Sequence, residues 1–382
     1  MHIAFLTPEY PSTKTGNSGG LGTSIKNLAN ALLSEGMQVS VFIYGQQEDE
    51  QYHENGIHFY RIKNIFMKGL SWWLTRKKVE HCINLANRKH NIDIIEVADW
   101  TGFSSFISFP CKIVMRLNGS DTYFCYLEKR PVKKWNKFLE KRAFSEANAI
   151  IAVSYFVGKT TNQIFNTNKK YTVIPNSIDA TVFKPNQVKC HEPLVLYFGT
   201  LIRKKGVLNI PQIFNSVIKQ MPNAHLVLVG GDTTDINSGN SSTWNMMKTL
   251  FTDEAFKQTT YLGQKPYEEI QQYIQKATVC IFPSYAEALP VSWLEAMAMG
   301  KGIVASNIGW AAEMIENKKE GLLYNPTSHE AFSNAILLLL SDEILCAEMG
   351  KNARLKVLTT FDNNIIAKRN IAFYKNLINE TQ

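Results

Sequence analysis

The sequence predicts an α/β protein built from two Rossmann-like, doubly wound domains that face a cleft between them. Strand-like and helix-like segments alternate along the chain, and the alternation restarts after a polar stretch at residues 184–193. A length of 382 residues suits two domains, and 45% hydrophobic against 19% charged residues is typical of globular chains. We therefore expect one domain over residues 1–186 and a second over residues 187–362.

In the first half, short β-rich runs flank a helix at residues 24–35, where apolar side chains recur at helical spacing before Gly36. Strand, helix and strand in this order predict a parallel sheet covered by helices. The predicted strands of this half are residues 2–7, 38–44, 92–97, 112–117, 149–153 and 171–174.

The second half repeats the pattern. Helical spacing is found at residues 207–220, 267–276, 292–299 and 310–316, and residues 331–380 are mostly helical. Ligands of such sheets bind beyond the carboxyl ends of the strands, so the loops that follow the strands are the candidate site. The predicted strands are residues 194–198, 225–229, 259–262, 279–282, 302–305 and 321–324.

Several classes of protein are disfavoured. No apolar run approaches the roughly 18 residues of a membrane helix, and the first residues are a strand and turn instead of a secretion signal. The six cysteines show no paired spacing and the eight histidines form no metal motif, so we expect a reduced, cytoplasmic protein without a metal site. The strand at residues 38–44 lacks the acidic residue that would hold an NAD ribose.

The net charge of +8 is confined to the first half. Residues 1–185 hold 23 Lys and Arg against 15 Asp and Glu, whereas residues 186–382 hold 18 of each. Residues 63–78 and 128–142 mix cations with Trp and Phe, which suits an anionic membrane surface, although a core-packed helix with a basic outer face explains them equally well. Nucleic acid is disfavoured because no recognition motif accompanies them.

Three loops carry candidate chemistry. Gly19 and Gly20 precede the first helix, where backbone N–H groups can face an anion. Arg203, Lys204 and Lys205 follow a strand and either bind phosphate or form a solvated basic turn. The nearby pair Asp232 and Asp235 is interpreted as solvated turn residues.

Two carboxylates, Glu287 and Glu295, lie eight residues apart around the start of a predicted helix. Carboxylates accept hydrogen bonds from vicinal sugar hydroxyls, so one interpretation is a sugar site. The other is a helix cap followed by a surface glutamate, and the spacing alone does not separate the two.

These motifs, in this order, resemble the GT-B glycosyltransferases, in particular the retaining family 4, or group 1. The resemblance rests on the glycine-rich first loop, the Lys205-Gly206 turn, the two glutamates and the Ala-Met-Ala-Met-Gly that follows them. Further matching segments are residues 152–154, 174–179, Gly263 and 306–313, so the resemblance spans residues 3 to about 326.

The resemblance implies a role for each matching position. Gly19 and Gly20 would approach the diphosphate of a nucleotide-sugar donor, and Lys205, with Arg203 and Lys204 beside it, would neutralise the diphosphate. Glu287 would contact the donor hexose, Glu295 the ribose, and residues 288–291, including Leu289, Pro290 and Val291, would lie along the sugar and phosphates. The family needs no metal or other cofactor, and its final helix, here residues 363–382, returns to the first domain.

Three positions depart from the family pattern. Thr200 replaces an arginine, Asn118 replaces a histidine near the reacting carbon, and Pro290 ends a Glu-Ala-Leu-Pro segment where Glu-Gly-Phe-Gly is usual. Asn118 can hydrogen-bond a sugar but cannot accept a proton at neutral pH. Together with Lys205 and Glu287, Asn118 forms the expected catalytic set.

The resemblance implies a retaining, metal-independent hexosyltransferase. It would use a nucleotide sugar, UDP-linked before others, and a polysaccharide, lipid-linked or other glycan acceptor of the bacterial surface. We expect it in the cytoplasm, with a peripheral position on the inner face of the membrane as an option. The alternatives are a sugar-nucleotide epimerase, a sucrose- or glycogen-type synthase, or a GT-B remnant that only binds a glycan or a partner.

Overall fold

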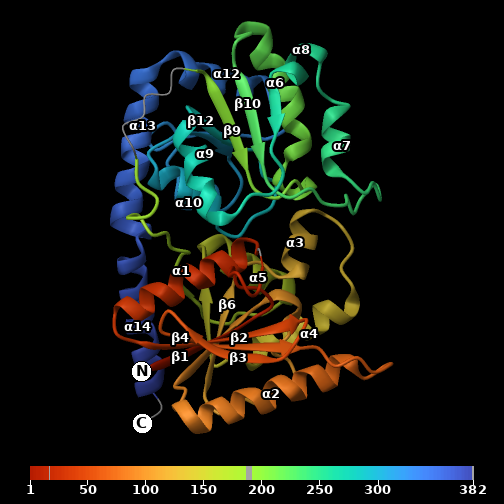
Figure 1. Cartoon of the computed structure of the whole chain (residues 1–382), viewed down its shortest axis with the longest axis vertical. Coiled ribbons are helices and arrows are strands. Elements are labelled where there is room, and N and C mark those ends of the chain that lie inside the picture. Colours follow the sequence, from red (N-terminus) through yellow and green to blue (C-terminus); the bar gives the residue numbers. More distant parts are fainter. Residues whose placement is uncertain (17, 186–191, 381–382) are drawn as a thin grey trace. The chain divides into compact units, whose positions relative to one another are not determined.

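The computed structural model describes residues 1–16, 18–185 and 192–380 of the chain (Figure 1). It divides into two compact units: unit 1 comprises residues 1–177 and the C-terminal segment from Asn363, and unit 2 comprises Ile178–Asp362. Each unit has its own parallel sheet and its own core, as predicted for two Rossmann-like domains. Within the described part of the chain, no helix is both long and apolar enough to cross a membrane.

Unit 1 is an eight-stranded sheet in the order β3-β4-β2-β1-β5-β6-β7-β8, parallel except for β3, which pairs antiparallel with β4. The hairpin of β3 and β4 adds strands that the periodicity did not predict. The elements are β1 (His2–Thr7), α1 (Gly20–Ser34), β2 (Gln38–Gln46), β3 (Glu50–Glu54), β4 (Ile57–Lys63), α2 (Ser71–His90), β5 (Ile94–Ala98), the 3-10 turn η1 (Trp100–Gly102), β6 (Lys112–Leu117), α3 (Asp121–Leu127), α4 (Lys134–Glu146), β7 (Ala149–Ala152), α5 (Tyr155–Phe165), β8 (Thr172–Val173) and α14 (Asn363–Asn379).

Unit 2 is a six-stranded, fully parallel sheet in the order β11-β10-β9-β12-β13-β14. Its strands are β9 (Leu194–Phe198), β10 (His225–Val229), β11 (Thr259–Tyr261), β12 (Val279–Phe282), β13 (Gly302–Ser306) and β14 (Leu322–Tyr324). Its helices and turns are η2 (Arg203–Lys205), η3 (Val207–Asn209), α6 (Ile210–Gln220), α7 (Thr243–Lys248), α8 (Asp253–Lys257), η4 (Tyr267–Glu269), α9 (Ile270–Lys276), α10 (Val291–Ala298), α11 (Ala311–Met314), α12 (His329–Ser341), α13 (Glu343–Lys356) and the π-helical η5 (Val357–Phe361).

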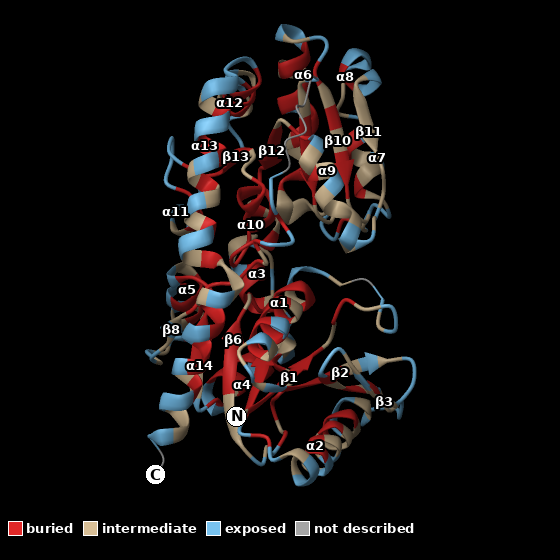
Figure 2. Cartoon of the chain, turned by 60° about the vertical axis from the view of Figure 1, so that its left-hand side comes forward, coloured by how far each residue is buried: buried red, intermediate tan, exposed pale blue. Residues whose placement is uncertain are grey.

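Burial explains why the strand runs are almost continuously apolar. Helices cover both faces of each sheet, so strands such as β1, β5 and β12 are buried along their whole length, whereas the helices alternate buried and exposed faces (Figure 2). In each sheet the strand order reverses at one point, between β1 and β5 in unit 1 and between β9 and β12 in unit 2. Loops diverge there, and ligands of this fold class bind beyond the strand ends at that point.

The predicted boundary at residues 186 and 187 lies outside the described residues. The segment just before it belongs to unit 2, because the Arg354 guanidinium donates hydrogen bonds to the carbonyl oxygens of Phe183 (3.0 Å) and Ala180 (3.3 Å). The chain returns to unit 1 in α14, which lies against α1 and adds Ile366, Ile371 and Tyr374 to the core of that unit.

A buried ion pair within the sheet of unit 1 is hydrogen-bonded to two side chains of α14. Arg116 on β6 donates to both carboxylate oxygens of Glu96 on β5 at 2.6 and 2.9 Å, and to Asn370 Oδ1 on α14 at 2.6 Å. The Tyr374 hydroxyl donates to Glu96 Oε2 at 2.5 Å. Burial alone would lower the pKa of Arg116, but the Glu96 carboxylate outweighs burial and raises it. The network is satisfied only when α14 is in place.

We expect Glu96→Gln to destabilise unit 1 by about 3–5 kcal/mol, because it leaves the Arg116 charge buried without its counterion. Tyr374→Phe removes one hydrogen bond to a charged group and should cost about 1.5–3 kcal/mol. The free energy of unfolding from urea titration followed by circular dichroism measures both. A Glu96→Gln loss no larger than that of Tyr374→Phe would show that the ion pair is not needed to hold α14.

Candidate functional site

Two loops of unit 2 meet beyond the carboxyl ends of β9 and β12, where the strand order reverses. The loop after β9 contains η2, and the loop after β12 spans residues 283–290. The Lys204 carbonyl oxygen accepts hydrogen bonds from the backbone N–H groups of Tyr285 (2.8 Å) and Ala286 (3.2 Å). The basic turn and the glutamate-bearing loop are therefore joined through their backbones.

Gly206 makes this close approach possible. Its φ is +67°, and a Cβ atom at this position would lie 1.8 Å from the carbonyl oxygen of Pro283. Any side chain would separate the two loops, so the glycine after Lys205 is a packing requirement of the site.

Lys205 and Glu287 face each other across the joined loops. Lys205 Nζ lies 3.6 Å from Glu287 Oε1, and the Ser284 hydroxyl donates to the same oxygen at 3.3 Å. The two side chains keep 22% and 12% of their surface exposed, so both can be reached from solvent. A cation beside a carboxylate suits a ligand that carries both an anionic group and hydroxyl groups.

Glu295 lies inside α10 and is buried. Burial raises its pKa to about 7, and the Tyr267 hydroxyl and the Lys205 charge act in the opposite direction. It is therefore neither a surface glutamate nor a helix cap. With a pKa of about 7 its carboxyl group titrates near neutral pH, and the positive charge of Lys205 favours the ionised form.

Arg203 is held differently from Lys205. Its Nε and Nη2 atoms donate to the two carboxylate oxygens of Asp235 at 2.7 and 2.8 Å, and this pairing lowers the pKa of Asp235. The Asp235 side chain is 1% exposed, so the prediction of a solvated turn residue is wrong for it. The sequence hides this pair because its partners are 32 residues apart. The charge of Arg203 is already balanced within the protein.

The remaining predicted positions of unit 2 surround these loops. The Thr200 carbonyl accepts from the Tyr197 hydroxyl at 3.0 Å within the loop after β9, and Gly263 accepts from the backbone N–H of Gly230 at 2.9 Å, which ties the ends of β10 and β11 together. Pro290 stands at the N-cap of α10 between the buried Leu289 and Val291. A proline N–H is not needed there, because the first N–H groups of a helix have no partner within it.

The glycine-rich loop of unit 1 already holds a carboxylate. Glu9 accepts from the backbone N–H of Gly19 at 3.2 and 3.1 Å and from that of Gly22 at 2.9 Å, while Gly20 is exposed at the start of α1. The N-terminus of α1 thus attracts an anion, as the glycines indicated, and the anion present is the protein's own side chain. Sequence reasoning passed over Glu9, although an acidic residue in a loop before a helix is a usable signal.

Asn118 follows β6 and is half-buried. Its backbone N–H donates to Asp99 Oδ1 and that of Gly119 to Asp99 Oδ2, each at 3.1 Å. Burial raises the pKa of Asp99 to about 7 against these hydrogen bonds. Asp99 therefore fixes the backbone that carries the Asn118 side chain. The sequence did not reveal Asp99, because its partners follow a different strand.

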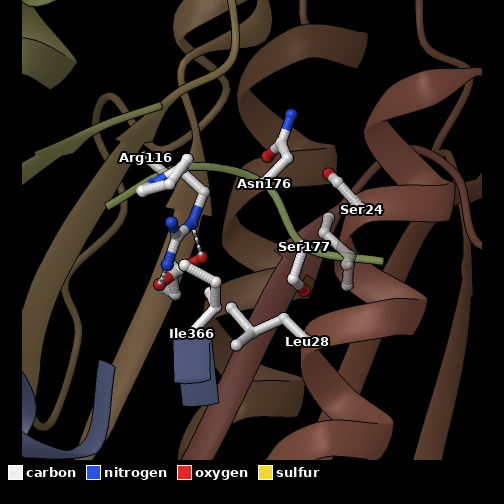
Figure 3. Close-up of a pocket in the computed structure, with 9 residues that line it drawn as sticks. Ser24, Leu28, Arg116, Asn176, Ser177 and Ile366 are labelled. Carbon is white, nitrogen blue, oxygen red and sulfur yellow. Dashed lines mark hydrogen bonds and ion pairs between the residues drawn. The ribbon is translucent and has the colours of Figure 1, made fainter. Parts of the chain in front are cut away.

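A small pocket opens beside the buried ion pair of unit 1 (Figure 3). Ser24 and Leu28 of α1, Asn176 and Ser177, Arg116 and Ile366 line it, together with Ile25, Glu96 and Pro175. Its charged groups are already paired with each other, so it does not form a second ligand site. In residues 1–16, 18–185 and 192–380, no three His, Cys, Asp or Glu side chains are placed to hold a metal ion.

Comparison with known proteins identifies the family of the chain. Residues 18–182 match the model of "Glycosyltransferase Family 4", and residues 179–356 match that of "Glycosyl transferases group 1". An uncharacterised glycosyltransferase of Methanocaldococcus jannaschii is 24% identical over 398 residues, which is 98% of each chain. The N,N'-diacetylbacillosaminyl-diphospho-undecaprenol alpha-1,3-N-acetylgalactosaminyltransferase of Campylobacter jejuni is 30% identical over 213 residues, 56% of this chain and 52% of that protein.

Solved structures show the same fold over the whole chain. Sucrose-phosphate synthase of Thermosynechococcus elongatus superposes with a TM-score of 0.81 at 21% identity and covers 99% of each chain. HepE of Anabaena, in complex with UDP and glucose, superposes with a TM-score of 0.73 at 19% identity, over 98% of this chain and 100% of its own. With two Rossmann-like units and family matches from residue 18 to residue 356, the chain belongs to the group 1, family 4 glycosyltransferases of the GT-B fold.

Proposed function

We propose that this glycosyltransferase moves a hexose-type sugar from a nucleoside diphosphate sugar, most readily UDP-linked, to a glycan or lipid-linked acceptor of the bacterial cell surface. The observation that carries the donor assignment is the contact of Lys205 with Glu287 at the strand reversal of unit 2, with the buried Glu295 within the field of the same lysine. A phosphate-binding cation and two hydroxyl-binding carboxylates are what a nucleotide sugar requires.

Each donor-side residue has a separate task in this proposal. Lys205 binds the diphosphate and neutralises the charge that grows on it as the sugar leaves. Lys204 contributes to the positive field of η2, whereas Arg203 is committed to Asp235 and acts by shaping the turn. Glu287 accepts from hexose hydroxyls and Glu295 from ribose hydroxyls. The donor charge is thus balanced by the protein's own cations, and we propose that no metal is required.

We propose retention at the anomeric carbon. The acceptor hydroxyl attacks from the face that the diphosphate leaves, the bond from the anomeric carbon to the diphosphate oxygen breaks, and that oxygen takes the acceptor proton. This path needs no protein base, which agrees with an amide at Asn118. Asn118, held through its backbone by Asp99, would orient a hydroxyl group of the substrates.

The Glu9 contact adds a condition to the role of Gly19 and Gly20. A diphosphate that approaches this loop meets a carboxylate on the same N–H groups, so Glu9 would have to turn away before these groups could bind it. We therefore assign the main charge neutralisation to Lys205.

On the acceptor side, we propose a place at the cytoplasmic face of the membrane, with residues 63–78 and 128–142 directed to anionic lipid. The C. jejuni relative is named for a sugar acceptor linked to diphospho-undecaprenol, which supports a lipid-linked acceptor. HepE, solved with UDP and glucose, supports the choice of UDP.

The test of the proposed function is a thermal-shift screen with UDP-, GDP-, ADP- and dTDP-sugars, with and without a chelator. A nucleotide sugar that binds raises the melting temperature by mass action, and we expect UDP-sugars to do so equally in the presence of EDTA. Donor turnover without an acceptor-dependent product would instead identify an epimerase. Binding without any turnover would identify a binding protein.

Lys205→Ala should lower the rate of sugar transfer by about 100- to 1,000-fold, because the leaving diphosphate loses its nearest cation. Lys219→Ala, which removes an exposed lysine of α6, is the matched control and should leave the rate unchanged. Initial rates with saturating donor measure the effect. Equal rates in both variants would contradict the assignment of Lys205.

Donor affinity should rise with pH through the pKa of Glu295, about 7, since the ionised carboxylate is the better acceptor for ribose hydroxyls. We expect a lower Kd for UDP-glucose at about pH 8 than at about pH 6. Glu295→Gln should bind more weakly and lose this pH dependence. Calorimetric titration at both pH values measures it, and a pH dependence that persists in Glu295→Gln would assign the titration to another group.

A further inference from the structure

An exposed aromatic cluster lies where α2, α4 and the segment after η1 meet. The ring centroid of Trp72 is 5.5 Å from that of Trp135 and 5.7 Å from that of Phe106, and Trp135 stacks on Phe138 at 5.4 Å. Trp72, Trp135 and Phe138 remain 37%, 49% and 48% exposed. Two segments that are far apart in the sequence therefore form one surface.

The residues that lead into α2 are also exposed and apolar. Phe66 is 82% exposed, and Met67, Leu70 and Trp73 are also exposed large apolar side chains. Single exposed apolar residues are ordinary, but a concentration of them marks an interaction site. We call the set the aromatic surface; it consists of Phe66, Met67, Leu70, Trp72, Trp73, Trp135 and Phe138.

Exposed lysines accompany both segments of the aromatic surface, and Lys68 lies between Met67 and Leu70 in the sequence. Lys133, Lys134 and Lys137, around the start of α4, are exposed and form no ion pair in the described part of the chain. The cations in the first turns of α2 are already engaged: Arg76 is buried, Lys77 pairs with Glu80 at 2.8 Å and Lys78 with Asp49 at 2.6 Å. Residues 63–78 therefore contribute mainly their exposed apolar side chains and Lys68 to this surface, whereas Arg76 is buried and Lys77 and Lys78 are paired.

The inner face of α4 is tied to the segment after Asn118. Glu140 accepts from the backbone N–H groups of Asp121 and Thr122, each at 3.0 Å, and Asn136 donates to the Asp121 carboxylate at 3.0 Å. One helix thus carries part of the aromatic surface and the lysines on its outside and supports the start of α3 on its inside.

We propose that the aromatic surface, with Lys133, Lys134 and Lys137 beside it, docks on a bilayer that contains anionic phospholipid. Trp side chains favour the lipid interface, and lysines reach the phosphate groups from the same depth. A second copy of the chain fits less well, because a two-fold contact would bring the same lysines together. The proposal deepens the proposed function by assigning the lipid contact to one face of unit 1 and to named residues, and its docking step does not depend on sugar transfer.

Vesicle sedimentation tests the proposal. We expect the full chain to bind vesicles of phosphatidylglycerol and phosphatidylcholine in equal parts and to bind pure phosphatidylcholine weakly. Replacing Lys133, Lys134 and Lys137 by Gln should weaken binding to the anionic vesicles about 100-fold at low salt. Trp135→Ala with Phe138→Ala should weaken binding to both kinds of vesicle.

The matched control replaces two whole ion pairs of the same region, Lys77→Gln with Glu80→Gln and Lys78→Gln with Asp49→Asn, so that its net charge stays the same. It should bind as the unaltered chain does. Three outcomes would overturn the proposal. The control could lose as much binding as the lysine variant, or all variants could bind vesicles equally. The third outcome is a switch from dimer to monomer in light scattering without any vesicle binding. A thermal shift with UDP-glucose, measured on each variant, shows that it is folded and separates failure of docking from failure of donor binding.

Discussion

The loops at the functional edge of unit 1 depend on one constraint, the need of their backbone N–H groups for an acceptor. Parallel strands end at this edge together, so loops and helix N-termini gather there with unpaired donors. Carboxylates, most of them buried, meet the need: Glu9 at Gly19 and Gly22, Asp99 at Asn118 and Gly119, and Glu140 at Asp121 and Thr122. Each acidic side chain holds a loop that the proposed chemistry uses.

This use of carboxylates also shapes the charge of the surface. Asp99 and Glu140 are buried, whereas lysines such as Lys133 and Lys134 remain exposed. The basic character that the composition assigns to the first half is therefore concentrated on the outside of unit 1. In unit 2, the charge of Arg203 is balanced by Asp235. Lys205 is the cation that lies beside Glu287.

Sequence periodicity predicted the alternating strands and helices well, because each depends on apolar spacing within a few residues. The hairpin of β3 and β4 was missed because β3 is a short polar strand at the sheet edge and because His58 and Arg61 interrupt the apolar residues of β4. Asp235 was misread for another reason: a carboxylate in a polar loop resembles a solvated one until a partner 32 residues away is known. Glu9 was passed over although it stands in the loop before the first helix, and Asp99 escaped notice because its hydrogen-bond partners, the backbone N–H groups of Asn118 and Gly119, are distant in the sequence.

The sequence by itself determined the fold class, the family and the positions of Lys205, Glu287 and Glu295, since these depend on local spacing and on motifs that a chain carries in order. Only the tertiary structure decided which charges are available. Burial raises the pKa of Glu295, ion pairing engages Arg203, Lys77 and Lys78, and packing of α2 on α4 brings Trp72 to Trp135. The charge state and availability of these side chains depend on solvent access and on partners distant in the sequence. Neither can be read from local sequence patterns.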